Sequence, residues 1–247
     1  MAICFEADQW QQHRFKWDEP FPTYEPLTRE IEIVDEALTA LTNAGILPHT
    51  RYDQARFLAH RAAVRENFEI PWTAITPRMQ RLIYAINAIA QPRVMVAVGI
   101  FCGNTFISNA GAAIGPGAVY HAERLVGLEI NPTEASRARR NVWTIDPAKQ
   151  AEVLAEDGLP WLEHVLGTLD LLYLDADGTE GRGKSIYLDL LETGLHALRP
   201  GSLVLAHNSV NCARDLGDYL AFVRDAANFR ASMNMIVDDQ GLEVSMR

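Results

Sequence analysis

After residue 92 the chain alternates short apolar runs with segments of helical periodicity, and this alternation restricts the fold more than any other feature of the sequence. Strands are predicted over 94–98, 125–130, 151–154, 169–175 and 202–206, and helices over 104–114, 132–143, 184–198 and 213–229, with a short helix near Pro160. The tail adds two apolar segments, 232–237 and 242–246, joined by a turn. Strands that alternate with helices predict an α/β fold with a doubly wound parallel sheet, here closed by an antiparallel C-terminal edge hairpin.

The first 76 residues have a different pattern. Aromatic residues and prolines interleave up to residue 27, and the prolines exclude a long helix there. Helical spacing then predicts one helix over 28–43, with Thr28 as its N-cap, and a second over 53–67. A third helix opens at Pro77 and stops before Pro92. We therefore expect an aromatic arm and helical cap or lid over 1–76, and the α/β domain over 77–247.

The balance of charges excludes two classes of partner. Among 247 residues, 22 Lys and Arg stand against 32 Asp and Glu, which gives a net charge of −10. Nucleic acid and anionic lipid bind basic surfaces, so we expect neither as a partner. The sequence has no apolar run of the roughly 18 residues that a membrane-spanning helix needs, and no charged-then-apolar leader, so we expect a cytoplasmic protein. The spacing of Cys4, Cys102 and Cys212 argues against a disulfide framework or a zinc site.

The residues that follow each predicted strand carry the functional information, because ligands of doubly wound sheets bind beyond the carboxyl ends of the strands. After the first strand, Gly99 and Gly103 bracket a loop that contains Phe101, and Asn104 and Thr105 open the next helix. Glycines let the main chain approach a ligand, and the N–H groups of a helix start can hold a carboxylate or phosphate. The alternative is a plain tight turn between a strand and a helix.

Acidic residues follow the next two strands. Glu129, with Asn131 two residues on, ends the second strand, where a carboxylate accepts hydrogen bonds from both ribose hydroxyls of a nucleoside. Asp157 follows the third strand and can accept from an adenine amino group. The alternatives are a solvated acid for Glu129 and a turn residue for Asp157.

Polar residues also end the two strands at the predicted centre of the sheet. Asp175 ends the fourth strand, and His207, Asn208 and Ser209 end the fifth. These side chains are expected to converge on one spot, because the carboxyl ends of neighbouring parallel strands share one edge of the sheet. A carboxylate, an imidazole, an amide and a hydroxyl there exceed what a turn requires, so we treat them as the candidate catalytic residues.

The order and spacing of these motifs resemble a known family. Residues 77–247 are similar to the class I S-adenosylmethionine-dependent methyltransferases, in the catechol and caffeoyl-CoA O-methyltransferase branch. The resemblance is carried by the nucleotide loop 97–105, the strand end 128–131, the L-D-A-D of 174–177, and 198–202 followed by Asn208. It implies a Rossmann-like methyltransferase fold with S-adenosylmethionine as cofactor. The cofactor-binding residues it implies are Gly99, Phe101, Gly103, Asn104, Thr105, Glu129, Asn131, Asp157 and Asp175.

The chain departs from that family at its metal site. The family binds Mg²⁺ through an Asp at the place of Asp175 and an Asp-Asn pair at the place of His207 and Asn208. Magnesium prefers oxygen ligands, so an imidazole in place of a carboxylate weakens the site. The family's lysine is replaced by Gly178, although Lys184 follows in a glycine-flanked insert. We therefore expect no metal and a metal-independent reaction.

Three functional hypotheses follow. The first is a transferase of secondary metabolism that moves the methyl group of S-adenosylmethionine to a small-molecule substrate under the helical cap. The second is a cyclase: the amine of S-adenosylmethionine displaces methylthioadenosine and leaves azetidine-2-carboxylate, as in bacterial enzymes that resemble methyltransferases. The third is a nucleoside-binding protein without catalysis. The oligomeric state stays open, although the helical caps of the family commonly pair as homodimers.

The aromatic arm has two interpretations. Its rings can fold over the mouth of the pocket as a lid, where they attract a sulfonium and exclude water, or they can pack on a neighbouring subunit or on the core. The rings concerned are Phe5, Trp10, Phe15, Trp17 and Tyr24. His13 and Arg14, in the same arm, are expected at the surface; the alternative is that they reach the methionine carboxylate of the cofactor.

Overall fold

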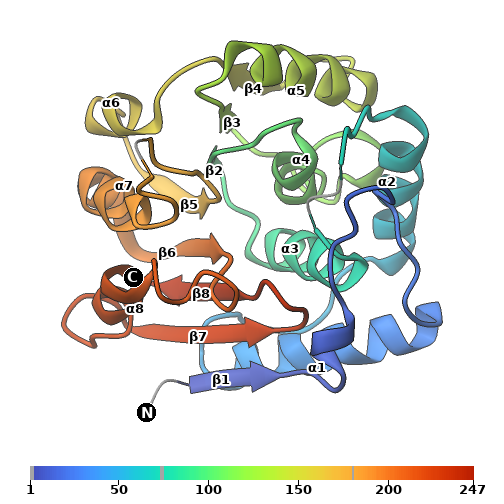
Figure 1. Cartoon of the computed structure of the whole chain (residues 1–247), viewed down its shortest axis with the longest axis horizontal. Coiled ribbons are helices and arrows are strands. Elements are labelled where there is room, and N and C mark those ends of the chain that lie inside the picture. Colours follow the sequence, from blue (N-terminus) through green and yellow to red (C-terminus); the bar gives the residue numbers. More distant parts are fainter. Residues whose placement is uncertain (1–2, 73–74, 180) are drawn as a thin grey trace.

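The computed structural model describes residues 3–72, 75–179 and 181–247, and these fold around one sheet (Figure 1). Its eight strands lie in the order β1-β7-β8-β6-β5-β2-β3-β4. Their bounds are β1 Ile3–Glu6, β2 Val94–Val98, β3 Arg124–Leu128, β4 Ala151–Leu154, β5 Leu169–Leu174, β6 Leu198–His207, β7 Ala231–Ile236 and β8 Leu242–Met246. Every pairing is parallel except those of β8 with β6 and β7. The predicted doubly wound sheet is confirmed.

The edge of the sheet differs from the prediction in one respect. The hairpin of β7 and β8 forms as expected, but β1 lies outside it and pairs in parallel with β7, from Ile3 opposite Met233 to Glu6 opposite Ile236. No strand was predicted in the arm, so β1 is an addition to the expected sheet. Four residues are too short a run to show strand periodicity, and only the unpaired edge of β7 makes this segment a strand.

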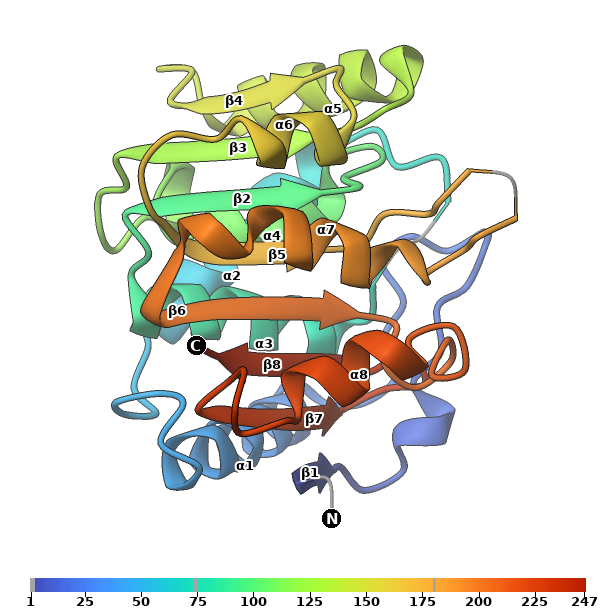
Figure 2. The same ribbon diagram turned by 90° about the vertical axis from the view of Figure 1, so that its left-hand side faces the viewer.

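Helices cover both faces of the sheet. Their bounds are α1 Leu27–Asn43, α2 Gln54–Asn67, α3 Pro77–Ala90, α4 Asn104–Ala110, α5 Pro132–Ile145, α6 Gly158–Glu163, α7 Ile186–Gly194 and α8 Gly217–Val223, with short 3₁₀ turns at Trp10–Gln12, Gly115–Gly117 and Leu195–Ala197. Figure 2 shows α6, α7 and α8 on one face, with α1, α3, α4 and α5 behind the sheet. Several predicted bounds were wrong: α1 begins at Leu27 with Pro26 as its N-cap instead of Thr28, and α4, α7 and α8 are shorter than expected. The strand predicted over 202–206 is longer, because β6 already begins at Leu198.

Alternate residues of each central strand point to opposite layers of the core. In β2, Met95 and Ala97 belong to the apolar cluster on the side of α1, α3, α4 and α5, whereas Val96 and Val98 belong to the cluster under α6, α7 and α8. This is the period of two that a strand buried on both faces requires. The sheet is therefore a rigid platform whose carboxyl ends can hold side chains in fixed positions.

The helical cap shares its core with the sheet. Val34 and Leu38 of α1 and Val64 of α2 lie in the same apolar cluster as Met95 and Leu125 of the sheet. Together with the pairing of β1, this ties the first 76 residues to the α/β layers at several places. The domain boundary at residue 76 stays a prediction.

A buried histidine in the cap makes the stability of the fold depend on pH. His60 of α2 is fully buried, stacks on Tyr84 with 5.5 Å between ring centroids, and occupies the space where a Cβ of Gly111 would lie 2.2 Å from its Cε1. Neither of its ring nitrogens has a hydrogen-bond partner among the described residues. Burial, with a smaller contribution from Arg61, lowers the pKa of His60 from 6.5 to about 3.

We expect the free energy of unfolding to fall as the pH drops below about 6.5. Between that pH and about 3 the unfolded chain binds a proton at His60 that the folded chain does not, so acid favours unfolding; at pH 5 the loss from this residue is about 2 kcal/mol. Urea unfolding at pH 7 and pH 5 measures it. The variant His60→Leu should lose that part of the pH dependence, whereas His49→Gln, at an exposed position, should keep it. If the free energy of unfolding changed equally with pH in both variants, His60 would not be the cause of the pH dependence.

Candidate active site

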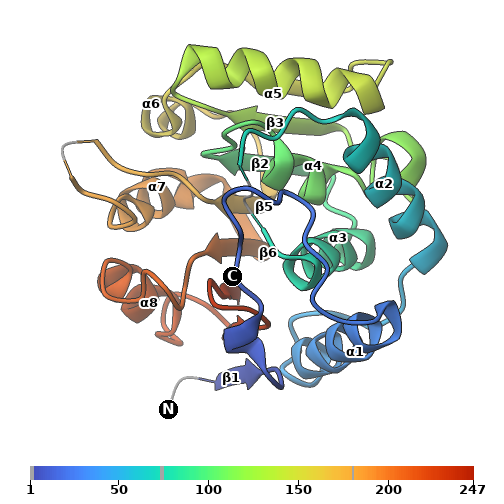
Figure 3. The same cartoon turned by 45° about the vertical axis from the view of Figure 1, so that its right-hand side comes forward.

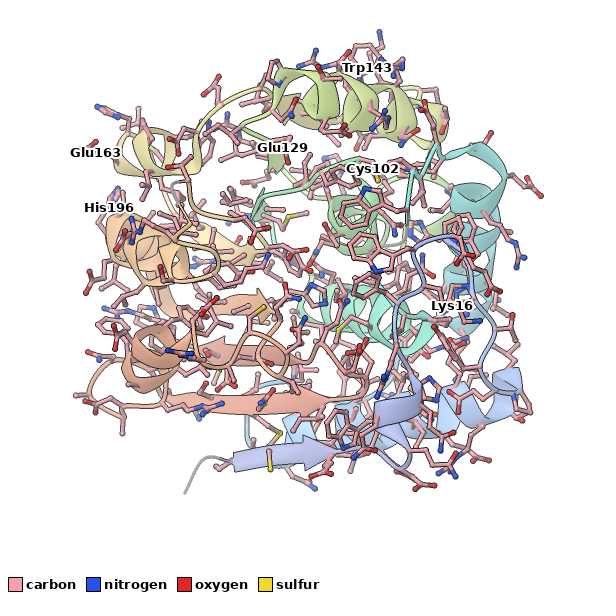
Figure 4. The ribbon with its side chains drawn as sticks, viewed as in Figure 1. Lys16, Cys102, Glu129, Trp143, Glu163 and His196 are labelled. Carbon is pink, nitrogen blue, oxygen red and sulfur yellow. The ribbon has the colours of Figure 1, made fainter. Side chains whose placement is uncertain are left out.

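A cavity of about 570 Å³ opens at the carboxyl ends of β2, β3, β5 and β6; we call it the strand-end cavity. Most of the predicted site residues line it, namely Gly99, Phe101, Asn104, Thr105, Glu129, Asp157, Asp175, His207 and Asn208. Figure 4 labels two lining residues, Glu129 at the end of β3 and Cys102 in the loop after β2. The convergence expected from the order of the strands is therefore present.

Three predicted site residues lie outside this lining and have structural partners. Gly103, at φ +90°, packs closely on Ala138, to which an added Cβ would come within 3.3 Å. The side chain of Asn131 accepts hydrogen bonds from two main-chain N–H groups at the start of α5. The Ser209 hydroxyl donates to Asn234 Oδ1 at 2.7 Å, away from the cavity. Their ligand contacts stay predictions.

The loop after β2 approaches the end of β5 very closely. Gly99 has φ +80°, and a Cβ at this position would lie 2.4 Å from the Ala176 Cα. Phe101, at φ +47°, also adopts a left-handed conformation, which is strained for a bulky residue. Its N–H donates to Glu129 Oε2 at 2.7 Å, a charge-assisted hydrogen bond that holds the loop in this conformation.

Glu129 keeps hydrogen-bonding capacity on both oxygens. Oε2 accepts from Phe101 and Oε1 accepts from the Asn131 N–H at 3.0 Å. A carboxylate offers about four lone-pair sites, so two remain for ligand donors. Two acceptors at the rim of the cavity fit the vicinal hydroxyls of a ribose. Asp157, in contrast, accepts a hydrogen bond from the Leu159 N–H through Oδ1 at 3.0 Å and so caps α6.

Asp175 and Lys184 form a buried ion pair in the cavity wall. Lys184 Nζ donates to Asp175 Oδ1 at 3.1 Å and to the Asp175 main-chain oxygen at 2.9 Å, and it lies 3.6 Å from Asp177 Oδ2. Burial alone raises the pKa of Asp175, but the charge of Lys184, with a smaller contribution from the neighbouring His207, outweighs it and holds that pKa below its ordinary value. For Lys184 burial lowers the pKa, and Asp175 and Asp177 more than offset it. The pair is therefore charged at neutral pH.

The residues at this place do not fit magnesium. The ammonium group of Lys184 is already bonded to Asp175 where the family places the metal, and His207 supplies nitrogen where the family has a carboxylate. Magnesium requires near-octahedral oxygen coordination, which this set cannot supply. Over 3–72, 75–179 and 181–247, no group of three or more His, Cys, Asp or Glu side chains is arranged to hold a metal ion.

His207 lines the strand-end cavity and has two ring nitrogens without partners among the described residues. Its side chain is 2 % exposed, and Nδ1 lies 3.4 Å from Asp175 Oδ1 without hydrogen-bond geometry. Within the described part of the chain, neither ring nitrogen has a hydrogen-bond partner. An unpaired buried polar atom costs about 1–3 kcal/mol, so an imidazole kept in this state is available to a ligand. The neighbouring Asn208 donates through Nδ2 to Asn211 Oδ1 at 3.2 Å.

A row of four aromatic rings runs from the arm to the loop after β2. The centroids of Phe15 and Trp17 lie 4.8 Å apart, those of Trp17 and Trp72 5.0 Å, and those of Trp72 and Phe101 4.6 Å. Phe15, Trp72 and Phe101 line the strand-end cavity. The course of the arm from β1 to α1 can be followed in Figure 3. Phe15 therefore brings part of the arm to the cavity, and the function of the arm as a lid stays a prediction.

The other arm residues have other places. Phe5 packs on the core from β1, Trp10 Nε1 donates to Glu6 Oε1 at 2.8 Å, and Tyr24 packs against His13. Arg14 is exposed as expected, but the surface position expected for His13 was wrong. The ring of His13 is buried against Tyr24, with Nε2 3.8 Å from Glu25 Oε2.

Sequence reasoning missed several lining residues. Trp72 lies in an irregular segment, and no local pattern marks its contact with Phe101. Thr179 and Arg182 line the cavity from the insert 178–183, whose ends meet in a bridge between Gly178 and Gly183. The glycine pair around a polar stretch directly after the fourth strand was the signal that could have found them. The three cysteines are free thiols, as expected.

Comparison with known proteins supports the fold. No protein-family model matches the chain, and no curated protein matches its sequence. Among the solved structures, 600 chains match. One is an O-methyltransferase from Bacillus cereus in complex with SAH, with 17 % identity and a TM-score of 0.56, covering 88 % of this chain and 100 % of that chain. Another is an SAH-bound Podospora anserina methyltransferase, with 13 % identity and a TM-score of 0.61, covering 92 % of this chain and 100 % of that chain. A third is the O-methyltransferase TomG from Streptomyces achromogenes, involved in tomaymycin synthesis, in complex with SAM (20 %, 0.54, 86 % and 95 %).

These likenesses establish that the chain has the Rossmann-like methyltransferase fold, as expected from its sequence. At identities of 20 % or less they do not extend to the activity. Among the helices of the described residues, none is long and apolar enough to cross a membrane.

Proposed function

We propose that the protein is an S-adenosylmethionine-dependent, metal-independent methyltransferase that acts on a small molecule. The observation that carries the proposal is the carboxylate of Glu129, held by the Phe101 N–H beside the Gly99 loop with two acceptor sites left at the rim of the strand-end cavity. The neighbours crystallised with SAM or SAH support the same cofactor. Small-molecule chemistry fits a cavity of about 570 Å³.

S-adenosylmethionine supplies an activated methyl group on a sulfonium, so the protein has to orient the acceptor and exclude water. Glu129 would accept hydrogen bonds from the ribose hydroxyls of the cofactor, and the loop at Gly99 would hold its tail. His207 offers its unpartnered nitrogens to the acceptor and takes its proton. Asp175, which binds Lys184, lies beside the imidazole, and Phe15 and Trp72 keep water from the cavity. The cytoplasmic location and the homodimer stay predictions.

One observation keeps the cyclase hypothesis in the test. The rings of Trp72 and Phe101 line the cavity with 4.6 Å between their centroids. Aromatic faces attract a sulfonium, and they could hold S-adenosylmethionine in the bent form in which its amine displaces methylthioadenosine. Cyclisation needs no second substrate, whereas methyl transfer does.

The test is to identify the products formed from the cofactor. We expect mass spectrometry to find adenosylhomocysteine only when an acceptor is present, at a rate that EDTA does not change, because Lys184 takes the place of a metal. Methylthioadenosine released from cofactor alone would instead assign the cyclase activity. Cofactor binding without either product, across acceptors that include hydroxy- and amino-carboxylates, would favour the non-catalytic hypothesis.

A further inference from the structure

A second cavity, of about 210 Å³, lies beneath the aromatic arm; we call it the arm cavity. Its wall consists of arm residues from His13 to Glu25, the first turn of α1 with Leu27 and Glu30, side chains of α2 and α3, Ile75, and Asn104 of α4. Asn104 also lines the strand-end cavity, so the two cavities meet at this side chain. The arm cavity therefore lies next to the proposed cofactor site without being part of it.

Three buried polar atoms of the lining residues lack partners. His13 Nδ1, Tyr24 Oη and Asn104 Oδ1 have no hydrogen-bond partner within the described residues. The residues His13 and Asn104 are 4 % and 3 % exposed. Each unsatisfied buried group costs about 1–3 kcal/mol, so a polar ligand that completed these hydrogen bonds would gain affinity.

The charges of the wall select against a cationic ligand. Glu25 receives two hydrogen bonds of 2.7 Å from Arg78, and Glu30 is held by Arg61 at 2.8 and 2.9 Å and by Arg81 at 2.5 Å. Both lining carboxylates are therefore neutralised by arginines.

Arg65, in contrast, is an exposed arginine whose guanidinium pairs with no carboxylate of the described residues. It lines the arm cavity from the last turn of α2, with Cζ 5.7 Å from the centroid of the Phe21 ring. Planar anions such as carboxylates are the preferred partners of an unpaired guanidinium. Between Arg65 and Asn104 the wall offers the apolar surfaces of Phe21, Pro22 and Ile75.

We propose that the arm cavity binds the methyl acceptor, a small hydroxy- or amino-carboxylate whose carboxylate pairs with Arg65 and whose hydroxyl or amine donates to Asn104. The inference rests on the proposed function. In the transfer, the bond between the methyl carbon and sulfur breaks with its electron pair going to sulfur, and a bond forms from that carbon to the acceptor oxygen or nitrogen at the junction of the two cavities. The acceptor proton passes through water to His207, which lines the strand-end cavity.

The test uses the full chain and three probes: 4-hydroxybenzoate, the uncharged 4-hydroxybenzamide, and S-adenosylmethionine. We expect calorimetry to show 4-hydroxybenzoate binding that weakens at least tenfold in Arg65→Gln, while binding of 4-hydroxybenzamide changes less than twofold. Thr23→Trp, which fills the cavity from an exposed position, should weaken both aromatic probes. Arg230→Gln, which removes an exposed arginine before the amino end of β7, is the matched control and should change nothing.

Binding of S-adenosylmethionine separates the two proposals. If all variants bind it normally but 4-hydroxybenzoate does not bind, or binds equally to wild type, Arg65→Gln and Thr23→Trp, the acceptor site is overturned and the proposed function stands. If wild type does not bind S-adenosylmethionine, the proposed function itself fails. Unchanged unfolding temperatures of Arg65→Gln and Thr23→Trp would show that a loss of binding is not a loss of folding.

Discussion

Replacing Glu129 by alanine is expected to weaken the binding of S-adenosylmethionine at least a hundredfold. The variant removes two acceptor sites for the ribose hydroxyls, and hydrogen bonds to a charged group contribute about 1.5–3 kcal/mol each. Two such bonds exceed the roughly 2.7 kcal/mol that a hundredfold change requires. The Phe101 N–H also loses its partner, so the loop at the cavity becomes less ordered. Isothermal titration of the cofactor measures the effect.

Two further variants make this result specific. Glu123→Ala removes a carboxylate just before β3, at the opposite end of that strand from the cavity, where it pairs with Arg93 at the surface, and should leave the affinity unchanged. Glu129→Gln retains one oxygen but turns an NH₂ group toward a main-chain N–H, so its affinity should lie between those of alanine and wild type. An unaltered affinity in Glu129→Ala would overturn the placement of the ribose.

Replacing Lys184 by methionine is expected to lower the free energy of unfolding by about 3 kcal/mol at pH 7. The variant leaves Asp175 buried without its cation, and breaking one side of a buried ion pair costs about 3–5 kcal/mol. Without the lysine the pKa of Asp175 rises in the folded chain, so the deficit should shrink as the pH falls and that carboxyl becomes protonated. Urea unfolding at several pH values measures both effects.

Lys16→Met is the matched control for Lys184→Met. Lys16 pairs with Glu19 at 2.6 Å, but both side chains are exposed, and such pairs contribute less than about 1 kcal/mol (Figure 4). The double variant Lys184→Met, Asp175→Asn should recover much of the lost stability, because the unpaired charge is gone. A loss in Lys184→Met no larger than that in Lys16→Met would contradict a buried, charged pair.

The central part of the fold could be predicted because its elements carry local signals. Each central strand is a short apolar run, and the strand ends bring Glu129, Asp175 and His207 together whatever the details of packing. Local sequence signals did not predict β1, because a four-residue strand forms only by pairing with an available sheet edge, here that of β7. It also could not separate Asn131 and Ser209 from the residues that face the cavity, since helix caps and ligand contacts use the same side chains.

Contacts between segments far apart in the sequence were beyond such reasoning. Trp72 reaches Phe101 through an irregular segment without periodicity, and the arm cavity arises where His13 and Asn104 come together. Both depend on the path of the arm across the sheet.

The pairing of β1 with β7 gives the polypeptide that follows β1 a second anchor. Residues 7–26 are fastened by a strand at one end and by α1 at the other, so they form a strap and not a tail. A segment anchored at both ends loses less conformational entropy than a free terminus when it becomes ordered over a bound molecule, so more of the contact energy remains as affinity. The anchor at β1 also joins the amino-terminal residues to the carboxyl-terminal strand β7, so changes at either end of the polypeptide affect the position and mobility of the strap.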